Sequence, residues 1–471
     1  MLTYMLDPSR KMPLYEQLYT AIRDDIVSGA LRSREKLPSK RKLAAHLRVS
    51  PVTIETAYGQ LVAEGYLESA PKRGYFVQTL SSVQPPRGSA PQPSPLHAAA
   101  PVDDCRYDFR TNVVDTDCFP FSIWAKLLRG VLTERSHELL RAPDPQGAPV
   151  LREEIRRYLY QYRGIEVDID QIIVGAGSEY LVGLLIQLLG RDKVYALENP
   201  GYPKLYRSFE ASGATVLPLP LDRHGLREDR LRAAAPDIVY LTPSHHFPLG
   251  VVMPAARRLA LLRWAEEDAH RYLIEDDYDS EFRYSSRPIP ALKGLDRADR
   301  VIYLNTFAKS LAPSLRIGYV VLPRPLAHQF RERLGFYSST VPSFEQYTLA
   351  EFLRTGAFER HISRSRNLYK ARRDTLLAAF AHSPLASCVH LSGADAGLHL
   401  LARVENGMDE DTLIARAHEA GVHVYGLSNH YLSAFAPCPA ATILLGYAGV
   451  PTEDIPDAVA QLAQAWHNKT S

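Results

Sequence analysis

The first 80 residues carry apolar side chains at helical spacing. The pattern predicts three helices and two short strands, at residues 14–28, 39–47, 50–64, 66–68 and 74–77. Ser39 and Ser50 each stand at the start of a predicted helix, where a serine hydroxyl can cap free N–H groups, and Pro51 suits the first helical position. Three helices followed by a strand hairpin predict a winged helix-turn-helix.

From about residue 106 onward, short apolar runs alternate with helical patterns. Six runs are typical of buried strands, at residues 171–174, 193–197, 215–219, 237–241, 272–275 and 301–304. This alternation predicts an α/β fold with a mostly parallel sheet. Ligands of such sheets bind beyond the carboxyl ends of the strands. Polar side chains follow three of those ends, at residues 175–178, 276–278 and 306–309, and we expect a ligand there.

Residues 81–102 separate these two patterns. Six of these 22 residues are proline and Arg87 is the one charged residue, a composition that favours extended chain without a core. The sequence therefore predicts a head (residues 1–80), a linker (81–105) and a body (106–471) whose smaller subdomain covers about residues 350–471.

Charge is distributed unevenly along the chain. The head has 12 Lys and Arg against 8 Asp and Glu, whereas the remainder has 43 against 45. Within residues 31–48 seven side chains are basic and Glu35 is the one acid. This pattern favours a polyanionic partner for the head alone, although a solvated charged face has the same composition.

The four cysteines are scattered and form no C-x-x-C pair, so we expect neither a metal site nor a disulfide framework. The first 50 residues lack the apolar core of a signal peptide. The longest apolar run, residues 180–189, is too short to span a bilayer. We therefore expect a cytoplasmic protein with no membrane partner.

Lys309 lies among side chains that suit pyridoxal phosphate. A lysine amine can form a Schiff base with the aldehyde of this cofactor. Thr306 and Ser310 supply hydroxyls nearby, and Arg316 supplies a bidentate cation for the phosphate. A surface lysine near an arginine is also common, so this stretch alone leaves both interpretations open.

The head resembles the GntR-type winged helix. The matching phrases are LPSKRKLA (37–44), VSPVTIETAY (49–58), LVAEGYL (61–67) and KRGYFV (72–77). The resemblance implies that the head binds operator DNA, with the third helix in the major groove. It assigns Ser50, Pro51, Thr53 and Thr56 to the leading end of that helix, Ser39 and Arg41 to phosphates, and Lys72 and Arg73 to the wing.

The body resembles fold-type I aminotransferases, and most closely the effector domain of MocR/GabR-type regulators. The matching phrases are YDF (107–109), DTDCFP (115–120), DPQG (144–147), ENPGY (198–202), TPSHHFPLG (242–250) and IEDDYDSEF (274–282). The resemblance covers nearly the whole chain and keeps the order of the domains. It implies a large domain with a mostly parallel sheet and a smaller α+β domain.

The resemblance also implies roles for individual residues. Asp276 would keep the pyridine nitrogen protonated, Tyr202 would stack on the ring, and Tyr278 would reach the ring hydroxyl. The phosphate would be held at the start of a helix, where free N–H groups suit an anion, and by the stretch after Lys309. These phosphate residues are Gly177, Ser178, Glu179, Thr306, Ser310 and Arg316.

Two departures from the family pattern bear on function. Aminotransferases of this fold place Asn before Pro-Thr-Gly, where this chain has Phe247, which favours a sensor over an enzyme. Regulators that answer to γ-aminobutyrate hold its carboxylate with two arginines. The matching effector positions here are Lys204, which can substitute in part as a point charge, and Asn429, which cannot form the charged pair. We therefore expect γ-aminobutyrate to be a poor effector.

Together these features predict a bacterial transcription regulator that binds operator DNA as a homodimer. Its effector would be pyridoxal phosphate itself or a small amino compound. Two alternatives remain open at this point. One is a working pyridoxal-phosphate-dependent transaminase with an accessory DNA-binding head, and the other is a DNA-binding scaffold whose cofactor site is vestigial.

Overall fold

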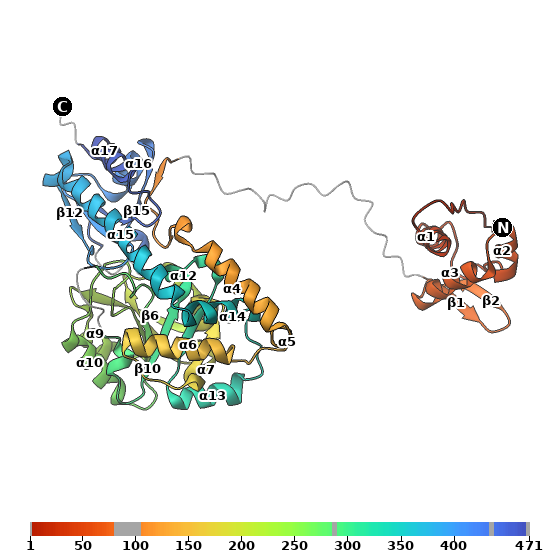
Figure 1. The fold of residues 1–471 in the computed structure, drawn as a ribbon, viewed down its shortest axis with the longest axis horizontal. Helices are drawn as coiled ribbons and strands as arrows, with labels where there is room; N and C mark the ends of the chain where they lie inside the picture. Colours follow the sequence, from red (N-terminus) through yellow and green to blue (C-terminus); the bar gives the residue numbers. More distant parts are fainter. Residues whose placement is uncertain (1, 80–104, 285–289, 433–437, 468–471) are drawn as a thin grey trace. The chain divides into compact units, whose positions relative to one another are not determined.

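The computed structural model describes residues 2–79, 105–284, 290–432 and 438–467. The chain divides into two compact units, Met1–Val102 and Asp103–Ser471 (Figure 1). The predicted linker over residues 81–105 lies outside the described residues except for Cys105. Within the described ranges, none of the helices has the length and the apolar run that a bilayer crossing requires.

The head is a winged helix, as the sequence predicts. Its elements are α1 (Leu14–Val27), α2 (Lys40–Leu47), α3 (Pro51–Ala63), β1 (Leu67–Ala70) and β2 (Gly74–Val77). The hydroxyl of Ser39 accepts a hydrogen bond from the backbone N–H of Lys42, and that of Ser50 accepts one from Thr53, so both predicted caps are present. β1 and β2 pair antiparallel and form the wing. Its core consists of fully buried side chains that include Leu18, Ile22, Leu43, Ile54 and Leu61.

The body centres on an eight-stranded sheet in the order β4-β11-β10-β9-β8-β5-β6-β7. The strands are β4 (Ile172–Gly175), β5 (Val194–Asn199), β6 (Thr215–Asp222), β7 (Gly225–Leu226), β8 (Ile238–Leu241), β9 (Tyr272–Asp276), β10 (Val301–Thr306) and β11 (Gly318–Val321). Neighbours from β10 to β6 pair in parallel, whereas β11 is antiparallel to both β10 and β4. All six predicted strands are present, and β7 and β11 are additions that the sequence pattern did not predict.

Helices cover both faces of this sheet, which explains why its strands are apolar almost without interruption. In β10, Tyr303 packs into one apolar cluster while Ile302 and Leu304 pack into another, as side chains that alternate between faces must. The helices of this part are α4 (Phe121–Glu134), α5 (Ser136–Leu139), α6 (Pro149–Tyr158), α7 (Ser178–Leu189), α8 (Pro203–Ala211), α9 (Glu228–Ala234), α10 (Ala255–Glu266), α11 (Leu292–Leu295), α12 (Phe307–Ser310), α13 (Arg324–Leu334) and α14 (Ser343–Arg354).

The long helix α15 runs from the large-sheet part to a smaller α+β part (Figure 1). The smaller part has a four-stranded sheet in the order β12-β13-β16-β15. Its elements are α15 (Ala357–Ala381), β12 (Val389–Ser392), β13 (His399–Val404), α16 (Glu410–Glu419), β14 (Val422–His423), β15 (Tyr425–Gly426), β16 (Thr442–Gly446) and α17 (Ile455–Trp466).

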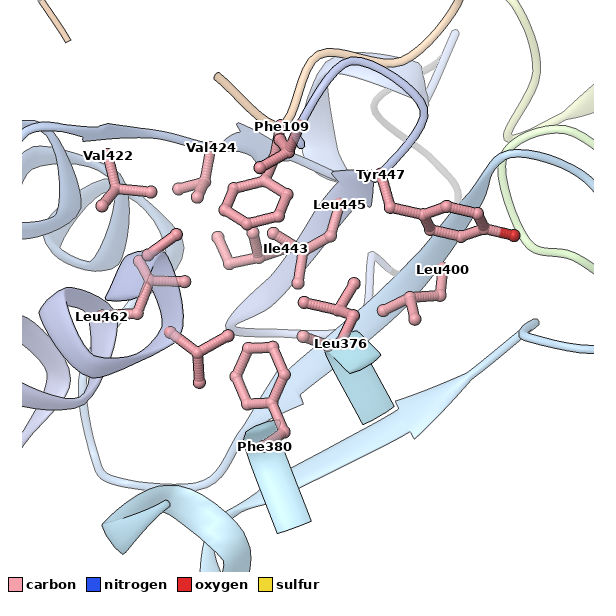
Figure 2. Close-up of a cluster of buried hydrophobic side chains, with 14 of the residues drawn as sticks. Phe109, Leu376, Phe380, Leu400, Val422, Val424, Ile443, Leu445, Tyr447 and Leu462 are labelled. Atoms are coloured by element: carbon pink, nitrogen blue, oxygen red, sulfur yellow. The ribbon is translucent and has the colours of Figure 1, made fainter. Parts of the chain in front are cut away.

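The first residues of the body also belong to this smaller part. β3 (Tyr107–Asp108) pairs in parallel with β14. Figure 2 shows the ring of Phe109 beside Ile443 and Leu445 of β16, in the cluster that also contains Phe380 of α15. The small part therefore includes a segment from before the large sheet, whereas residues 350–354 of the predicted range of about 350–471 belong to α14 of the large-sheet part. A large part with a mostly parallel sheet and a smaller α+β part agree with the predicted fold class.

Candidate functional site

A cavity of about 290 Å³ lies at the carboxyl ends of the central strands of the large sheet. Thr242 follows β8, Asp276 ends β9 and Thr306 ends β10. The parallel arrangement brings these positions to one edge, as expected. The other lining residues that bear on function are Asn112, Ser178, Glu179, Glu198, Tyr202, Lys204, Tyr240, His246, Phe247, Tyr278, Lys309, Arg316 and Leu432.

Lys309 stands on the short helix α12, directly after β10. Burial lowers the pKa of its amine to about 7, although the nearby charge of Asp279 acts in the opposite direction. A large fraction of the amine is therefore neutral near pH 7, whereas an ordinary lysine remains charged. A neutral amine is the nucleophile that an aldehyde requires.

Asp276 lines the cavity at the end of β9. Burial raises the pKa of its carboxyl to about 7, and the charge of Asp277 adds to this effect. The hydroxyl of Tyr240 donates a hydrogen bond to Asp276 Oδ2 at 2.5 Å, which acts to lower that pKa. A buried carboxylate with a raised pKa is stabilised by a cation, and a protonated ring nitrogen supplies one.

Aromatic side chains form the walls between these two groups. Tyr202 precedes α8, and its ring meets the ring of Phe247 edge-to-face with centroids 5.8 Å apart. The hydroxyl of Tyr278 lies 3.2 Å from His245 Nδ1, and the same nitrogen lies 2.7 Å from Asp279 Oδ2. Tyr202 and Tyr278 both line the cavity.

The predicted phosphate residues gather at the start of α7. Ser178 and Glu179 are its first two residues, and Gly177 has φ +88°. A Cβ at Gly177 would lie 2.7 Å from Arg316 Nη2, so a side chain there would displace the guanidinium from this helix. Arg316 Nη2 also lies 2.5 Å from Glu179 Oε2. A helix N-terminus with an adjacent arginine suits a phosphate.

Some predicted site residues lie outside the cavity. Among the described residues that line it, Gly177, Ser310 and Asn429 are not included. Ser310 is buried behind Lys309, and its carbonyl oxygen lies 2.9 Å from His361 Nε2. Asn429 is exposed on the turn after β15, where its neighbour His430 packs edge-to-face on Phe247. The structure thus brings Lys204 to the cavity without Asn429.

Sequence reasoning assigned no role to Tyr240 or Glu198. Tyr240 lies within an apolar strand, where a tyrosine is more often part of the core. Glu198 accepts hydrogen bonds from the backbone N–H and the hydroxyl of Thr242, at 2.8 and 2.9 Å, yet burial raises its pKa to about 7. Glu198 lies in one of the phrases that match the family, and that match could have pointed to it. Tyr240 could not be found in this way, because its contact with Asp276 joins two strands that are far apart in the sequence.

These groups fit pyridoxal phosphate in chemical type and in position. Lys309 would hold the aldehyde carbon, Asp276 would pair with the ring nitrogen, and Arg316 would bind the phosphate. When bound, the cofactor supplies an electron-accepting ring and a carbon that reacts with amines. The protein supplies a partly neutral amine and a buried acid.

The predicted DNA-contacting residues lie on the exposed parts of the head. Ser50 and Pro51 begin α3, and the hydroxyl of Thr56 donates to the carbonyl of Val52 at 3.0 Å, within the helix. Arg41 on α2, Lys72 and Arg73 are exposed. The roles of the individual residues in the head and in the cavity stay predictions.

The fold and the cavity together define a class, a pyridoxal-phosphate-binding body with a winged-helix head. The model for aminotransferase class I and II matches residues 108–462, and the model for bacterial regulatory proteins of the gntR family matches residues 14–77. The chain is similar to the HTH-type transcriptional regulator YdeL of Bacillus subtilis, with 40% identity over 99% of each chain. It is 32% identical to the HTH-type pyridoxine biosynthesis transcriptional regulator PdxR of Corynebacterium glutamicum, over 90% of each chain.

A solved structure has the same fold as the body. The kynurenine aminotransferase of Pyrococcus horikoshii is 25% identical with a TM-score of 0.68, and the match covers 78% of this chain and 92% of that one. The chain belongs to the family of HTH-type transcriptional regulators that join a gntR-type head to an aminotransferase class I and II domain. Membership confirms the predicted resemblance, the predicted cofactor and DNA as the partner of the head. It favours the regulator over the transaminase.

Proposed function

We propose that this chain is a cytoplasmic regulator that senses pyridoxal phosphate itself, so that occupancy of the body changes the affinity of the head for operator DNA. The observation that carries the proposal is the arrangement of the two predicted effector positions. Lys204 is ion-paired with Glu179, and Asn429 is not among the described residues that line the cavity. Most of the residues suited to the cofactor line the cavity, whereas the two predicted effector positions are not brought together there as a carboxylate clamp.

The relative PdxR supports this proposal. It is named for pyridoxine biosynthesis, and pyridoxine is a vitamin form of the same cofactor. A regulator that responds to the cofactor needs a site for the cofactor alone, with no second ligand.

We also propose that the protein is a homodimer. Large apolar side chains are exposed on the body, including Phe121 (69%), Phe336 (77%) and Leu140 (81%). Exposed apolar surface favours association with another protein surface. A two-fold symmetric dimer would present two heads to two half-sites on DNA. Sedimentation analysis of the full chain would detect a monomer and refute this part.

The sensing proposal is tested by titration of cofactor-stripped protein with pyridoxal phosphate. Operator affinity is followed by fluorescence anisotropy at fixed salt. We expect a large change in operator affinity with no amino compound present. The proposal would be refuted if the operator affinity does not change with the cofactor but does change with micromolar γ-aminobutyrate.

A further inference from the structure

Glu179 lies between two cations at the open side of the cavity. Its Oε2 lies 2.5 Å from Arg316 Nη2, and its Oε1 pairs with Lys204 Nζ. Glu179 is also the second residue of α7, so the positive end of that helix dipole faces the same place. The protein therefore places its own carboxylate among three features that favour an anion.

The charge on this carboxylate is present at every physiological pH. Burial acts to raise the pKa of Glu179, but hydrogen bonds from Lys204 and Arg316 outweigh it and lower the pKa to about 2. A phosphate group beside Arg316 would therefore meet a fixed negative charge. Like charges at this range repel, so phosphate and Glu179 compete for the guanidinium.

Arg316 makes contacts in addition to the one with Glu179. Its backbone adopts φ +53° at the end of a short helical turn, and its Nη2 donates to the carbonyl of Ala176 at 3.3 Å. The guanidinium also packs against Gly177, where a Cβ would lie 2.7 Å from Nη2. Arg316 Nη2 would therefore keep its hydrogen bond to Ala176 when Glu179 is replaced, and a bound phosphate would compete with Glu179 for the same guanidinium.

We infer that Glu179 sets the ligand specificity of this site, an inference that rests on the proposed function. Its carboxylate competes with the cofactor phosphate for Arg316. When phosphate holds Arg316, Glu179 keeps its contact with Lys204, and that ammonium is withheld from the carboxylate of an amino acid. An amine that carries a carboxylate then binds the site no more tightly than an amine that lacks one.

The first test compares Glu179→Gln with the wild-type full chain, using pyridoxal phosphate and pyridoxal as ligands. We expect about fivefold tighter binding of pyridoxal phosphate and unchanged binding of pyridoxal, which has no phosphate. The matched control is Glu267→Gln, since Glu267 also bridges two arginines, Arg232 at 2.8 Å and Arg271 at 3.1 Å, away from the cavity. Both ligands should bind this control as they bind wild type. Unchanged or weaker binding of pyridoxal phosphate to Glu179→Gln would overturn the competition.

The second test compares γ-aminobutyrate with butylamine, by the concentration that half-shifts the cofactor absorbance. Wild type should show no preference for the carboxylate, Glu179→Gln should prefer γ-aminobutyrate by about fivefold, and addition of Lys204→Met should remove that preference. A wild type that prefers γ-aminobutyrate, or a Glu179→Gln variant that does not, would overturn the inference. If Glu179→Gln does not fold, Glu179→Ala, which also removes the negative charge, is held to the same criteria. Failure of the proposed function would be seen separately, as a wild-type operator affinity that does not follow the cofactor.

Discussion

The head and the body place their cations in opposite environments. Arg41, Lys72 and Arg73 of the head are exposed, whereas Lys309 of the body lies in a cavity where burial lowers its pKa to about 7. An exposed cation attracts a polyanion at long range, and salt screens that attraction. A buried amine acts through its geometry and through a covalent bond. One chain thus contains two kinds of recognition that experimental conditions can separate.

The largest effect is expected from Lys309→Ala. This change removes the amine that would bind the cofactor covalently, so the adduct trapped by borohydride should be lost completely while the fold is kept. Mass spectrometry after reduction measures the adduct. Lys370→Ala, at an exposed lysine on α15, is the control and should retain full labelling. Covalent trapping in Lys309→Ala would show that another lysine holds the cofactor.

Added salt should weaken DNA binding by the head far more than cofactor binding by the body. Operator affinity should fall about 100-fold between roughly 50 and 200 mM salt, because several phosphate contacts release counterions. Cofactor affinity should change by less than about fivefold over the same range, since one phosphate is involved. Arg41→Ala should reduce the salt slope of DNA binding by about one and weaken all DNA sequences alike. A cofactor affinity that is as sensitive to salt as DNA binding would refute the contrast between the exposed cations of the head and the buried amine of the body.

The pH dependence of cofactor attachment should reveal the lowered pKa of Lys309. With a pKa of about 7, the neutral fraction of the amine rises about tenfold from about pH 6 to about pH 8. The initial rate of covalent attachment, measured by stopped-flow absorbance, should rise by the same factor and then level off. The reaction of free N-acetyl-lysine is the control, and its rate should rise about 100-fold. A 100-fold rise in the protein would mean that Lys309 is not buried in solution.

Tyr240→Phe is expected to have an effect of about the same size on the affinity for the cofactor. It removes the hydrogen bond that stabilises the ionised form of Asp276 and should weaken cofactor binding about tenfold, since a hydrogen bond to a charged group contributes about 1.5 kcal/mol. Tyr195→Phe is the matched control, because the hydroxyl of Tyr195 is bonded to the carbonyl of Gly190 and lies outside the cavity lining. If the two variants bind the cofactor with equal affinity, the hydroxyl of Tyr240 does not contribute to cofactor binding.

Local patterns in the sequence were sufficient for most of the fold. Ser39 and Ser50 predicted the starts of α2 and α3 because capping depends on residues close in the chain. β11 was not predicted, because a strand of four residues directly after the Arg316 turn has no periodicity of its own. Its place between β4 and β10 depends on pairing with segments far away in the sequence.

The same distinction applies to the site. The position of Lys309 and Asp276 at the cavity could be predicted, because each lies in a phrase with a recognisable chemical composition. The ion pairs of Glu179 could not, because they join α7 to residues on two other elements. The sequence predicted that Lys204 binds an effector. The structure shows that its ammonium is already paired with the carboxylate of Glu179.

The antiparallel pairing of β10 with β11 also bears on the entropy of cofactor binding. Thr306 pairs with Gly318, and the backbone N–H of Phe307 donates to the carbonyl of Ile317 at 2.9 Å. Lys309 and Arg316 therefore lie in one loop whose two ends are fastened to each other. Their backbone freedom is lost when the sheet forms, before any ligand arrives. Cofactor binding then requires little further ordering of the chain, and a preorganised loop of this kind converts more of its contact energy into affinity.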